Sequence, residues 1–297
     1  MLYKVIKISF RIIILNTIIL YHLTICEVDG SLISDAELLN ISEELFNKSV
    51  NVFYKHLCIK YQGQITSKNF TDNAPERLLN VSFNDVTTKT TDSLIKLFDN
   101  YELNTYQSEI ITIEKNAEED EFINNLMETN VMLHTMYYLS VKGFFINDLK
   151  VYKNVLKEIW FHPYSRSKRI NSSSGFEHVF VGESKRRKGI IGVHNWIFFY
   201  FGELTSKINY FGYSRRKEFP NGAAILEIYF TYNGRRKIST MFIGTPPELE
   251  IALYTLCFFT RPNKTCKISF IGSKFGIQTY VLKNDNKRYV GTAFPVI

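Results

Sequence analysis

Cysteine is scarce in this sequence of 297 residues, which contains only four. Cys26 falls in an N-terminal segment that we expect to be removed, so three cysteines remain and at most one bridge can form within the chain. Cys257 and Cys266 flank the break at Arg261-Pro262-Asn263 and can close a short loop. Two buried free thiols are the alternative. In either case Cys58 stays unpaired.

A long uninterrupted apolar run is also missing. The best candidate, within residues 1–26, is interrupted by Asn16 and His22 and is too short for a spanning helix of about twenty residues. The segment carries three basic residues and no acidic one: Lys4, Lys7 and Arg11. This layout is typical of a secretory signal peptide cleaved near Cys26, with a signal anchor as the alternative. We therefore predict a chain without a stable membrane span, secreted or held in the lumen of the secretory pathway.

Sequons for N-linked glycosylation agree with export and predict a glycoprotein. They begin at Asn40, Asn47, Asn69, Asn80, Asn171 and Asn263.

Several functional signatures are absent. No serine or cysteine sits in a recognisable nucleophile elbow, so a protease-like hydrolase has no support. No group of His, Cys, Asp or Glu has a spacing dedicated to a metal, and no short repeat recurs. What is present is a hydrophobic fraction of 45% and an aromatic fraction of 15%, which favour a well-packed globule. The length allows one large domain or two lobes around a shared cleft.

Acidic residues are outnumbered, and the formal net charge is +7. Removing the three basic residues of the N-terminal segment leaves 7 − 3 = +4, which is compatible with a polyanionic ligand without demanding one. Three basic clusters fall in turn-like positions: Lys185-Arg186-Arg187-Lys188, Arg215-Arg216-Lys217 and Arg235-Arg236-Lys237. They predict either a basic rim that gathers phosphates or ordinary solvated hairpin tips.

The pattern from 31 to 157 is mostly helical. Ser34 offers a capping residue before an apolar stripe, and Thr91-Asp92 precedes another. The acidic run Glu118–Glu121 is interpreted as the start of a helix that continues through Leu133, because carboxylates suit the positive end of a helix. His56 and His134 lie in this half and are interpreted as structural.

The pattern from 158 to 297 is rich in strands. Asn233-Gly234 is a strong hairpin signal between β-branched and aromatic runs. Thr245-Pro246-Pro247-Glu248 predicts a capping box that opens a helix. His162 precedes Pro163 and is interpreted mainly as a packing residue. The predicted fold class is α+β, with a helical N-terminal lobe followed by a lobe rich in antiparallel sheet.

Two histidines sixteen positions apart form the most informative feature. His178 lies in the run Gly175–Glu183 and His194 in the run Gly192–Trp196, and each run resembles a strand. The basic turn between them predicts a hairpin that can bring both imidazoles to one site. A pair of imidazoles can act as a general base and a general acid.

The two histidine runs, together with later segments, resemble the EndoU family, the poly(U)-specific endoribonucleases first described as XendoU. The segments that carry the resemblance include Leu97–Glu102, Trp160–Arg166, Phe242–Tyr254 and Thr279-Tyr280, so it covers most of the chain from about residue 35.

The resemblance implies a catalytic group made of His178, His194 and Lys237. Arg236 is the alternative cation, because counting back from Phe242 reaches Arg236 while counting forward from Gly234 reaches Lys237. With a base on the 2′-oxygen, an acid on the 5′-oxygen and a cation on the phosphorane, such a group would convert RNA to 2′,3′-cyclic phosphate ends. We hypothesise that His194 is the base and His178 the acid.

The resemblance also implies substrate-binding residues and a cofactor. Thr279 and Tyr280 would contact uracil, and Glu177 would orient the site or help to hold an ion. Mn²⁺ is the expected cofactor, with no ligands assigned. The expected substrate is single-stranded, uridine-containing RNA, and the expected state is a monomer. The alternative is a catalytically silent secreted protein that binds RNA or a receptor on the same fold.

Overall fold

The computed structural model describes residues 33–49, 56–66, 71–82, 87–167, 170–284 and 286–297. The predicted signal segment 1–26 and the sequon at Asn69 lie outside these ranges. Within them, no helix combines the length and apolar character needed to cross a bilayer. The asparagines of the remaining sequons are all exposed: Asn40, Asn47, Asn80, Asn171 and Asn263. Their glycosylation stays a prediction.

The first half is mainly helical, as the sequence predicted. Its elements are α2 (Asp35–Lys48), β1 (Leu57–Ile59), β2 (Leu79–Val81), α3 (Lys89–Lys96), the short 3₁₀ turn η4 (Leu97–Asp99), α4 (Ile113–Met127), α5 (Asn130–Val141) and α6 (Leu149–Phe161). Side-chain caps explain where these helices begin. The Ser34 hydroxyl accepts a hydrogen bond from the Glu37 amide at 3.1 Å, which confirms the predicted cap. The next cap is Thr88, three residues before the predicted Thr91.

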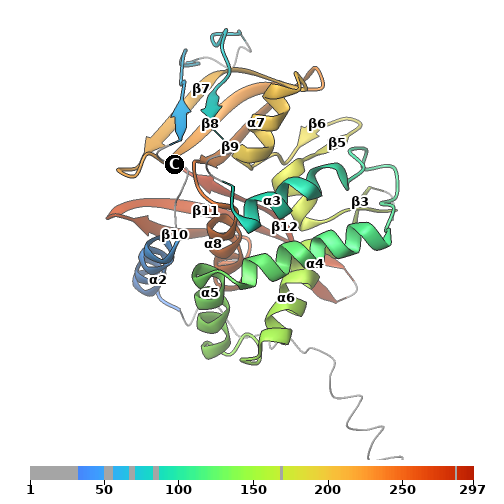
Figure 1. The fold of residues 1–297 in the computed structure, drawn as a ribbon, viewed down its shortest axis with the longest axis vertical. Helices are drawn as coiled ribbons and strands as arrows, with labels where there is room; N and C mark the ends of the chain where they lie inside the picture. The colour runs from blue at the N-terminus through green and yellow to red at the C-terminus, as the bar shows by residue number, and fades with distance from the viewer. Residues whose placement is uncertain (1–32, 50–55, 67–70, 83–86, 168–169, 285) are drawn as a thin grey trace, which may run out of the picture.

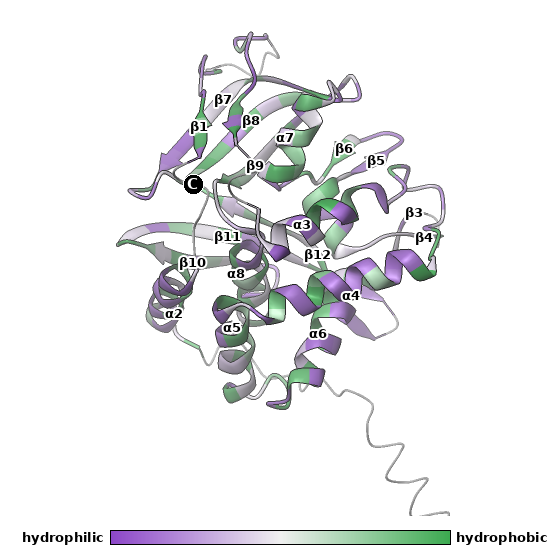
Figure 2. Cartoon of the chain, in the orientation of Figure 1, coloured by the Kyte–Doolittle hydropathy of each residue, from purple (hydrophilic) through white to green (hydrophobic). Residues whose placement is uncertain are grey.

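The acidic run was wrongly predicted to open a helix. Helix α4 begins at Ile113, because the Thr112 hydroxyl caps it by accepting the Lys115 amide. The acidic run therefore lies in the middle of α4, where Glu119 pairs with Lys157 of α6 at 2.8 Å. Much of α4 is hydrophilic (Figure 2). The apolar pattern beyond Met127 belongs to the separate helix α5, capped by Thr129.

The second half carries most of the sheet. Its elements are β3 (Tyr164–Ser167), β4 (Ile170–Ser173), η5 (Glu177–Val181), β5 (Glu183–Lys185), β6 (Gly189–Ile191), α7 (Trp196–Leu204), β7 (Ile208–Glu218), β8 (Ala224–Tyr232), β9 (Arg235–Ile243), α8 (Pro247–Thr260), β10 (Thr265–Phe270), β11 (Ser273–Asn284) and β12 (Lys287–Val296). Two antiparallel sheets have the orders β7-β8-β9 and β10-β11-β12. Asn233 and Gly234 have φ values of 48° and 71°, so the predicted two-residue hairpin turn is confirmed.

The helices of the first half pack against the last sheet, as Figure 1 shows for α2 beside β10 and α5 beside α8. The rings of Phe46 in α2 and Phe270 in β10 stack with centroids 4.0 Å apart. The Trp160 indole of α6 donates to the Thr255 hydroxyl of α8 at 3.0 Å. The α+β class is therefore correct. The predicted boundary between 157 and 158 divides the sequence by secondary structure, and one hydrophobic core crosses it.

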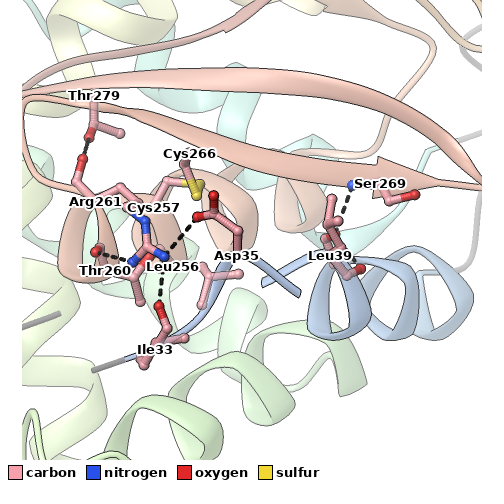
Figure 3. The surroundings of a disulfide bond; sticks show 11 residues. Ile33, Asp35, Leu39, Leu256, Cys257, Thr260, Arg261, Cys266, Ser269 and Thr279 are labelled. Carbon is pink, nitrogen blue, oxygen red and sulfur yellow. Dashed lines mark hydrogen bonds and ion pairs between the residues drawn. A yellow bond between two sulfur atoms is a disulfide. The ribbon is translucent and has the colours of Figure 1, made fainter. Parts of the chain in front are cut away.

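Helix α8 is buried along its whole length. The predicted capping box at its start is wrong, because Pro246 is the N-cap and makes no side-chain cap, while the Thr245 hydroxyl donates to Glu250 at 2.6 Å. Near the far end of α8, a disulfide joins Cys257 of this helix to Cys266 of β10. Beside that disulfide, Arg261 donates to the Ile33 carbonyl and pairs with Asp35 (Figure 3). These contacts tie α2 to the end of α8.

Candidate active site

The two predicted site histidines do not lie in strands. His178 belongs to η5, a single turn of π-helix, and His194 lies in the loop just before α7. Only the short strands β5 and β6 form the predicted hairpin, around the basic turn. The turn of η5 forms because the Gly182 amide reaches back five residues to the Glu177 carbonyl at 2.7 Å. An apolar, β-branched run was therefore mistaken for a strand.

The histidine segments nevertheless lie side by side. The Val193 amide donates to the His178 carbonyl at 3.1 Å, and the His194 amide donates to the Val179 carbonyl at 2.7 Å. This close approach requires Gly192, which has a φ of 76° and whose added Cβ would lie 1.9 Å from the His178 carbonyl oxygen. The two imidazole centroids are 6.1 Å apart. The two rings therefore lie close together, as the predicted shared site requires.

His178 is held by a buried carboxylate. Its Nδ1 lies 3.0 Å from Glu183 Oε1, and the same oxygen accepts from Arg166 Nε at 2.7 Å and from the Ser173 hydroxyl at 2.6 Å. Burial alone would raise the pKa of Glu183, but His178 and Arg166 hold this pKa below its ordinary value. Burial and the Arg166 charge lower the pKa of His178 to about 4, although Glu183 opposes the change. Without substrate, His178 is therefore neutral beside an ionised carboxylate.

His194 is held by neutral groups. Its Nδ1 lies 3.0 Å from the Thr240 carbonyl oxygen and 2.9 Å from the Ser239 hydroxyl, which donates its own proton to the Val193 carbonyl at 2.6 Å. The ring stacks on Phe294 with centroids 4.8 Å apart. Burial, then the nearby Lys237 charge, lowers the pKa of His194 well below its ordinary value. This imidazole is therefore neutral.

Lys237 is the cation that the structure places beside the histidines. It lies on β9, and burial lowers its pKa to about 8. Within the described residues it forms no ion pair. The neighbouring Arg236 does not line the cleft. Of the two cations left open by the sequence, only Lys237 is among the described residues that line the cleft.

These side chains line one open cleft with a volume of about 620 Å³. Its walls come from β3, η5, the β5–β6 hairpin, β9 and the last two strands. The lining residues are Ser165, Arg166, His178, Lys185, Lys188, Ile191, Gly192, His194, Glu227, Lys237, Ile238, Ser239, Thr240, Leu282, Thr292 and Phe294. Four of these residues are lysine or arginine and one is acidic, so the cleft suits a phosphate group.

Residues 37–295 match the sequence profile of the family described as Endoribonuclease XendoU. The chain belongs to this family.

Relatives in the XendoU family confirm the match. A bovine uridylate-specific endoribonuclease is 34% identical over 280 residues, which are 89% of this chain and 66% of the bovine protein. The chain thus spans just under two thirds of that relative. The uridylate-specific endoribonuclease EndoU of Drosophila melanogaster is 33% identical over 87% of this chain and 82% of its own length. A poly(U)-specific endoribonuclease of Xenopus tropicalis is 40% identical over 70% of this chain and 72% of its own.

A solved structure shares the fold. It is described as "The structure of XendoU: a splicing independent snoRNA processing endoribonuclease" and superposes with a TM-score of 0.72 at 33% identity. The superposition covers 88% of this chain and 96% of the solved chain. The α+β architecture is therefore that of the XendoU family.

Three predicted substrate-binding residues do not line the cleft. Glu177 is completely buried beneath it, and burial followed by the nearby Glu183 charge raises the pKa of Glu177 well above its ordinary value. Thr279 is also completely buried, and its hydroxyl donates to the Arg261 carbonyl near the disulfide (Figure 3). Tyr280 is half-exposed on β11 and pairs with Thr292 of β12, so its side chain points to the same face of the sheet as Thr292, although Tyr280 itself does not line the cleft. A direct contact of Glu177 or Thr279 with RNA does not fit this arrangement.

Sequence reasoning missed several residues that the cleft contains. Arg166 pairs with Glu183, the carboxylate that holds His178, and Ser239 forms a hydrogen bond with His194 itself. Thr292 and Phe294 face the cleft from β12, and the Thr292 hydroxyl is buried without a partner in the described part of the chain. Their spacing of two along a strand is the only signal that the sequence offers, and every exposed or buried strand shares it.

The basic clusters are only partly gathered around the site. Lys185, at the end of β5, and Lys188, in the turn that follows, line the cleft. The tip of this hairpin is hydrophilic (Figure 2). In the second cluster Arg215 pairs with Glu227 at 2.7 Å, and Arg216 pairs with Glu218 at 3.2 Å. A basic rim therefore exists on the hairpin side, and the second cluster is largely neutralised.

Two of the other histidines play structural roles, as predicted. His162 ends α6 and its ring stacks on Tyr289 with centroids 4.6 Å apart. His134 lies 2.8 Å from Glu44.

The described residues do not provide a dedicated metal site. No three His, Cys, Asp or Glu side chains among them are grouped as ligands. Glu183 already accepts bonds from Arg166, His178 and Ser173, and burial and the Glu183 charge raise the pKa of Glu177, which favours its neutral form over the carboxylate that a metal ion needs. The implied Mn²⁺ thus finds no fitting donor set here, and no step below is routed through it.

Proposed function

We propose that the chain is an endoribonuclease that cleaves single-stranded RNA at uridines. The 2′-hydroxyl attacks the adjacent phosphate, and the products are a 2′,3′-cyclic phosphate and a free 5′-hydroxyl. The observation that carries this proposal is the convergence of His178, His194 and Lys237 on one cleft, with imidazole centroids 6.1 Å apart. The relatives' names, uridylate-specific and poly(U)-specific endoribonuclease, supply the substrate class.

His194 is proposed as the general base. The Thr240 carbonyl can only accept a hydrogen bond, so the proton of the neutral ring sits on Nδ1. The other ring nitrogen, Nε2, then carries a lone pair that can take the proton of the 2′-hydroxyl. The lowered pKa of His194 keeps the ring unprotonated near neutral pH.

His178 is proposed as the general acid. Glu183 Oε1 accepts from Nδ1, so Nε2 faces away from the carboxylate and is the nitrogen that can donate to the departing 5′-oxygen. Glu183 favours the charged imidazole, and a bound phosphodiester adds a second negative charge that raises the pKa of His178 from its unliganded value. The same partner holds the ring orientation fixed.

Lys237 is proposed to stabilise the phosphorane. The phosphodiester carries one negative charge, and its equatorial oxygens gain a second as the deprotonated 2′-oxygen adds, so a preorganised cation beside them lowers the barrier. The pKa of about 8 leaves the ammonium charged at neutral pH. Since it has no ion-pair partner among the described residues, its charge is available to the phosphate.

Uridine preference is proposed to arise at Thr292 and Phe294. The unpartnered Thr292 hydroxyl can donate to a uracil carbonyl or accept from N3–H, and the Phe294 ring adds an aromatic surface beside His194. Of the pair predicted for this role, Thr279 is completely buried, and Tyr280 is half-exposed on the same face of the sheet as Thr292.

The test uses a short RNA with a single uridine and analyses the product ends by mass spectrometry. We expect a cyclic phosphate on the uridine fragment and a hydroxyl on the other. A substrate with 2′-deoxyuridine at that position is the matched control and should stay intact. Cleavage of the deoxy substrate would refute the 2′-hydroxyl mechanism, and binding without any cleavage would select the catalytically silent alternative.

Export, a monomeric state and Mn²⁺ dependence complete the proposal as predictions. The exposed sequon asparagines and the disulfide between Cys257 and Cys266 support passage through an oxidising compartment. Any effect of Mn²⁺ would be expected through the RNA phosphates, because the donor set of the cleft does not fit the ion.

A further inference from the structure

A second cavity lies behind the β5–β6 hairpin. Its volume is about 600 Å³, close to that of the catalytic cleft, and it opens between the hairpin, the loop after η4 and the start of β9. The residues used below are Glu102, Asn104, Tyr106, Arg186, Asn233 and Arg235. None of them has a role in the chemistry described above.

The hairpin separates this cavity from the cleft. In its antiparallel register Glu183 pairs with Ile191 and Ser184 pairs with Ile190, and paired residues point to the same face. One face therefore carries Glu183, Lys185 and Ile191 toward the catalytic histidines. The opposite face carries Ser184, Arg186 and Ile190 into the second cavity. An RNA chain that passes the edge of the β5–β6 hairpin can therefore enter both the catalytic cleft and the second cavity.

Strand β9 provides a path along that edge. Arg235 lines the second cavity and Lys237 lines the cleft. Being two residues apart, they point to the same side of β9 with a spacing of about 6.6 Å along the strand. Two cations in such a row can follow successive phosphates of one strand.

The contents of the second cavity fit a nucleotide. Neither Arg186 nor Arg235 forms an ion pair with a described carboxylate, and Arg235 instead donates to the Ser184 hydroxyl at 2.5 Å. Their charges are therefore available to a phosphate. Tyr106 is half-buried and offers an aromatic face, and the Asn104 and Asn233 amides can bond base edges.

The acidic residue of the cavity, Glu102, makes the two ends of the cavity differ in charge. Glu102 accepts the Asn104 amide at 3.0 Å, so it belongs to the loop that carries Tyr106 and not to the arginine side. A phosphate is disfavoured near this carboxylate and favoured near Arg186 and Arg235. The base would accordingly lie toward Tyr106.

We propose that this cavity is a second RNA subsite, which holds a nucleotide flanking the cleaved linkage. Its base stacks on Tyr106 and its phosphate contacts Arg186 and Arg235. The proposal rests on the proposed function and adds to it a length requirement: the substrate must extend beyond the uridine and its neighbour to use both cavities.

The experiment measures kcat/KM for a dinucleotide with one uridine and for oligonucleotides extended by three adenosines on the 5′ side or the 3′ side. With the wild-type chain, we expect extension on one side to raise kcat/KM about tenfold or more, since stacking of one base gives gains of this size. Equal kcat/KM values for all three substrates would overturn the proposal. Failure to cleave any substrate would instead refute the proposed function.

Variants then locate the gain. Tyr106→Ala and Arg235→Glu should each remove most of the advantage of the extended substrate, mainly through KM, and Tyr106→Phe should keep it. Arg186→Glu should also reduce by about one the number of counterions released on binding, read from the salt dependence of KM. Tyr137→Ala and Lys274→Glu, which change exposed residues outside both cavities, are the matched controls and should preserve the ratio.

The ratio between the extended substrate and the dinucleotide is the deciding quantity. A variant that loses both substrates equally would indicate damage to the cleft through the hairpin, and such a result for both Tyr106→Ala and Arg235→Glu would overturn the subsite. If the ratio falls equally in Lys274→Glu, the loss comes from overall charge, and the subsite is overturned.

Discussion

His178 and His194 are the same residue type in two different surroundings. His178 faces an ionised carboxylate that it shares with Arg166, whereas His194 faces a backbone carbonyl and a hydroxyl. Both rings are buried, and burial lowers the pKa of each. The carboxylate opposes that change at His178, while no carboxylate opposes it at His194.

This difference teaches how one cleft can assign opposite proton-transfer roles to identical side chains. A ring beside a carboxylate is the easier one to protonate when a phosphate binds, so it suits the acid. A ring whose Nδ1 proton is fixed by a carbonyl presents a lone pair on Nε2, so it suits the base. The comparison of the two histidines can be tested by removing either ring, the cation Lys237, or the side chain that supports each ring, Glu183 or Ser239.

Removal of either ring should have the largest effect. His178→Ala and His194→Ala are each expected to lower kcat by about 10²- to 10⁴-fold, the range for one general acid or base. The measurement is single-turnover cleavage of an RNA with one uridine. Because the two rings act in one step, the double variant should lose much less than the product of the single losses. Full activity in either single variant would refute the catalytic assignment.

Removal of the cation should be the next largest. Lys237→Ala is expected to lower kcat by about 10²- to 10³-fold, as for loss of one preorganised group on a charged transition state. Lys237→Arg should recover part of this rate.

The pH profile identifies the charge. With a pKa of about 8, the Lys237 ammonium loses its proton as the pH rises through that value, so wild-type cleavage should show a fall there that is separate from the fall set by deprotonation of the general acid His178. Arginine stays protonated, so Lys237→Arg should move this fall to higher pH. If this fall stays at the same pH in Lys237→Arg, a group other than Lys237 causes it.

Loss of the carboxylate beside His178 should have the third largest effect. Glu183→Gln is expected to lower kcat by about 10- to 150-fold, the equivalent of one hydrogen bond to a charged group. Since Glu183 favours protonated His178, the pKa of the general acid should drop and the fall of kcat with rising pH should move to lower pH. A circular dichroism melt is the control, because Arg166 loses its buried partner in this variant.

Loss of the hydroxyl beside His194 should have the smallest effect. Ser239→Ala leaves the Thr240 carbonyl to hold the Nδ1 proton, so kcat should fall by only about two- to tenfold, the value of one neutral hydrogen bond. The same pH profile should keep its shape. A larger loss than in Glu183→Gln would reverse the ranking of the two environments.

Local signals in the sequence predicted much of the fold. Asn233-Gly234 adopts positive φ at both positions, which is a property of the two residues themselves, and the Ser34 cap depends only on a neighbouring amide. Cys257 and Cys266 are near neighbours along the chain, so the sequence could also predict their disulfide. The XendoU family match extends over the same motifs.

Long-range features were beyond the sequence. His178 lies in a π-helical turn because Gly182 reaches back to Glu177, and an apolar run does not distinguish this turn from a strand. Thr279 and Thr292 both lie in strands, and only the pairing of Thr279 with Ala293 and of Tyr280 with Thr292 decides which threonine faces the cleft. Arg166 lies on β3 and Glu183 on β5, and only the three-dimensional fold brings these two residues together.

The most direct test of the two roles replaces the bridging 5′-oxygen of the scissile phosphate by sulfur. A thiolate leaves without a proton, so the general acid becomes unnecessary while the general base is still required. We predict that cleavage of this substrate by His178→Ala approaches the wild-type rate and that His194→Ala stays inactive. Rescue of His194→Ala alone, or of neither variant, would contradict the assignment of His178 as the acid and His194 as the base.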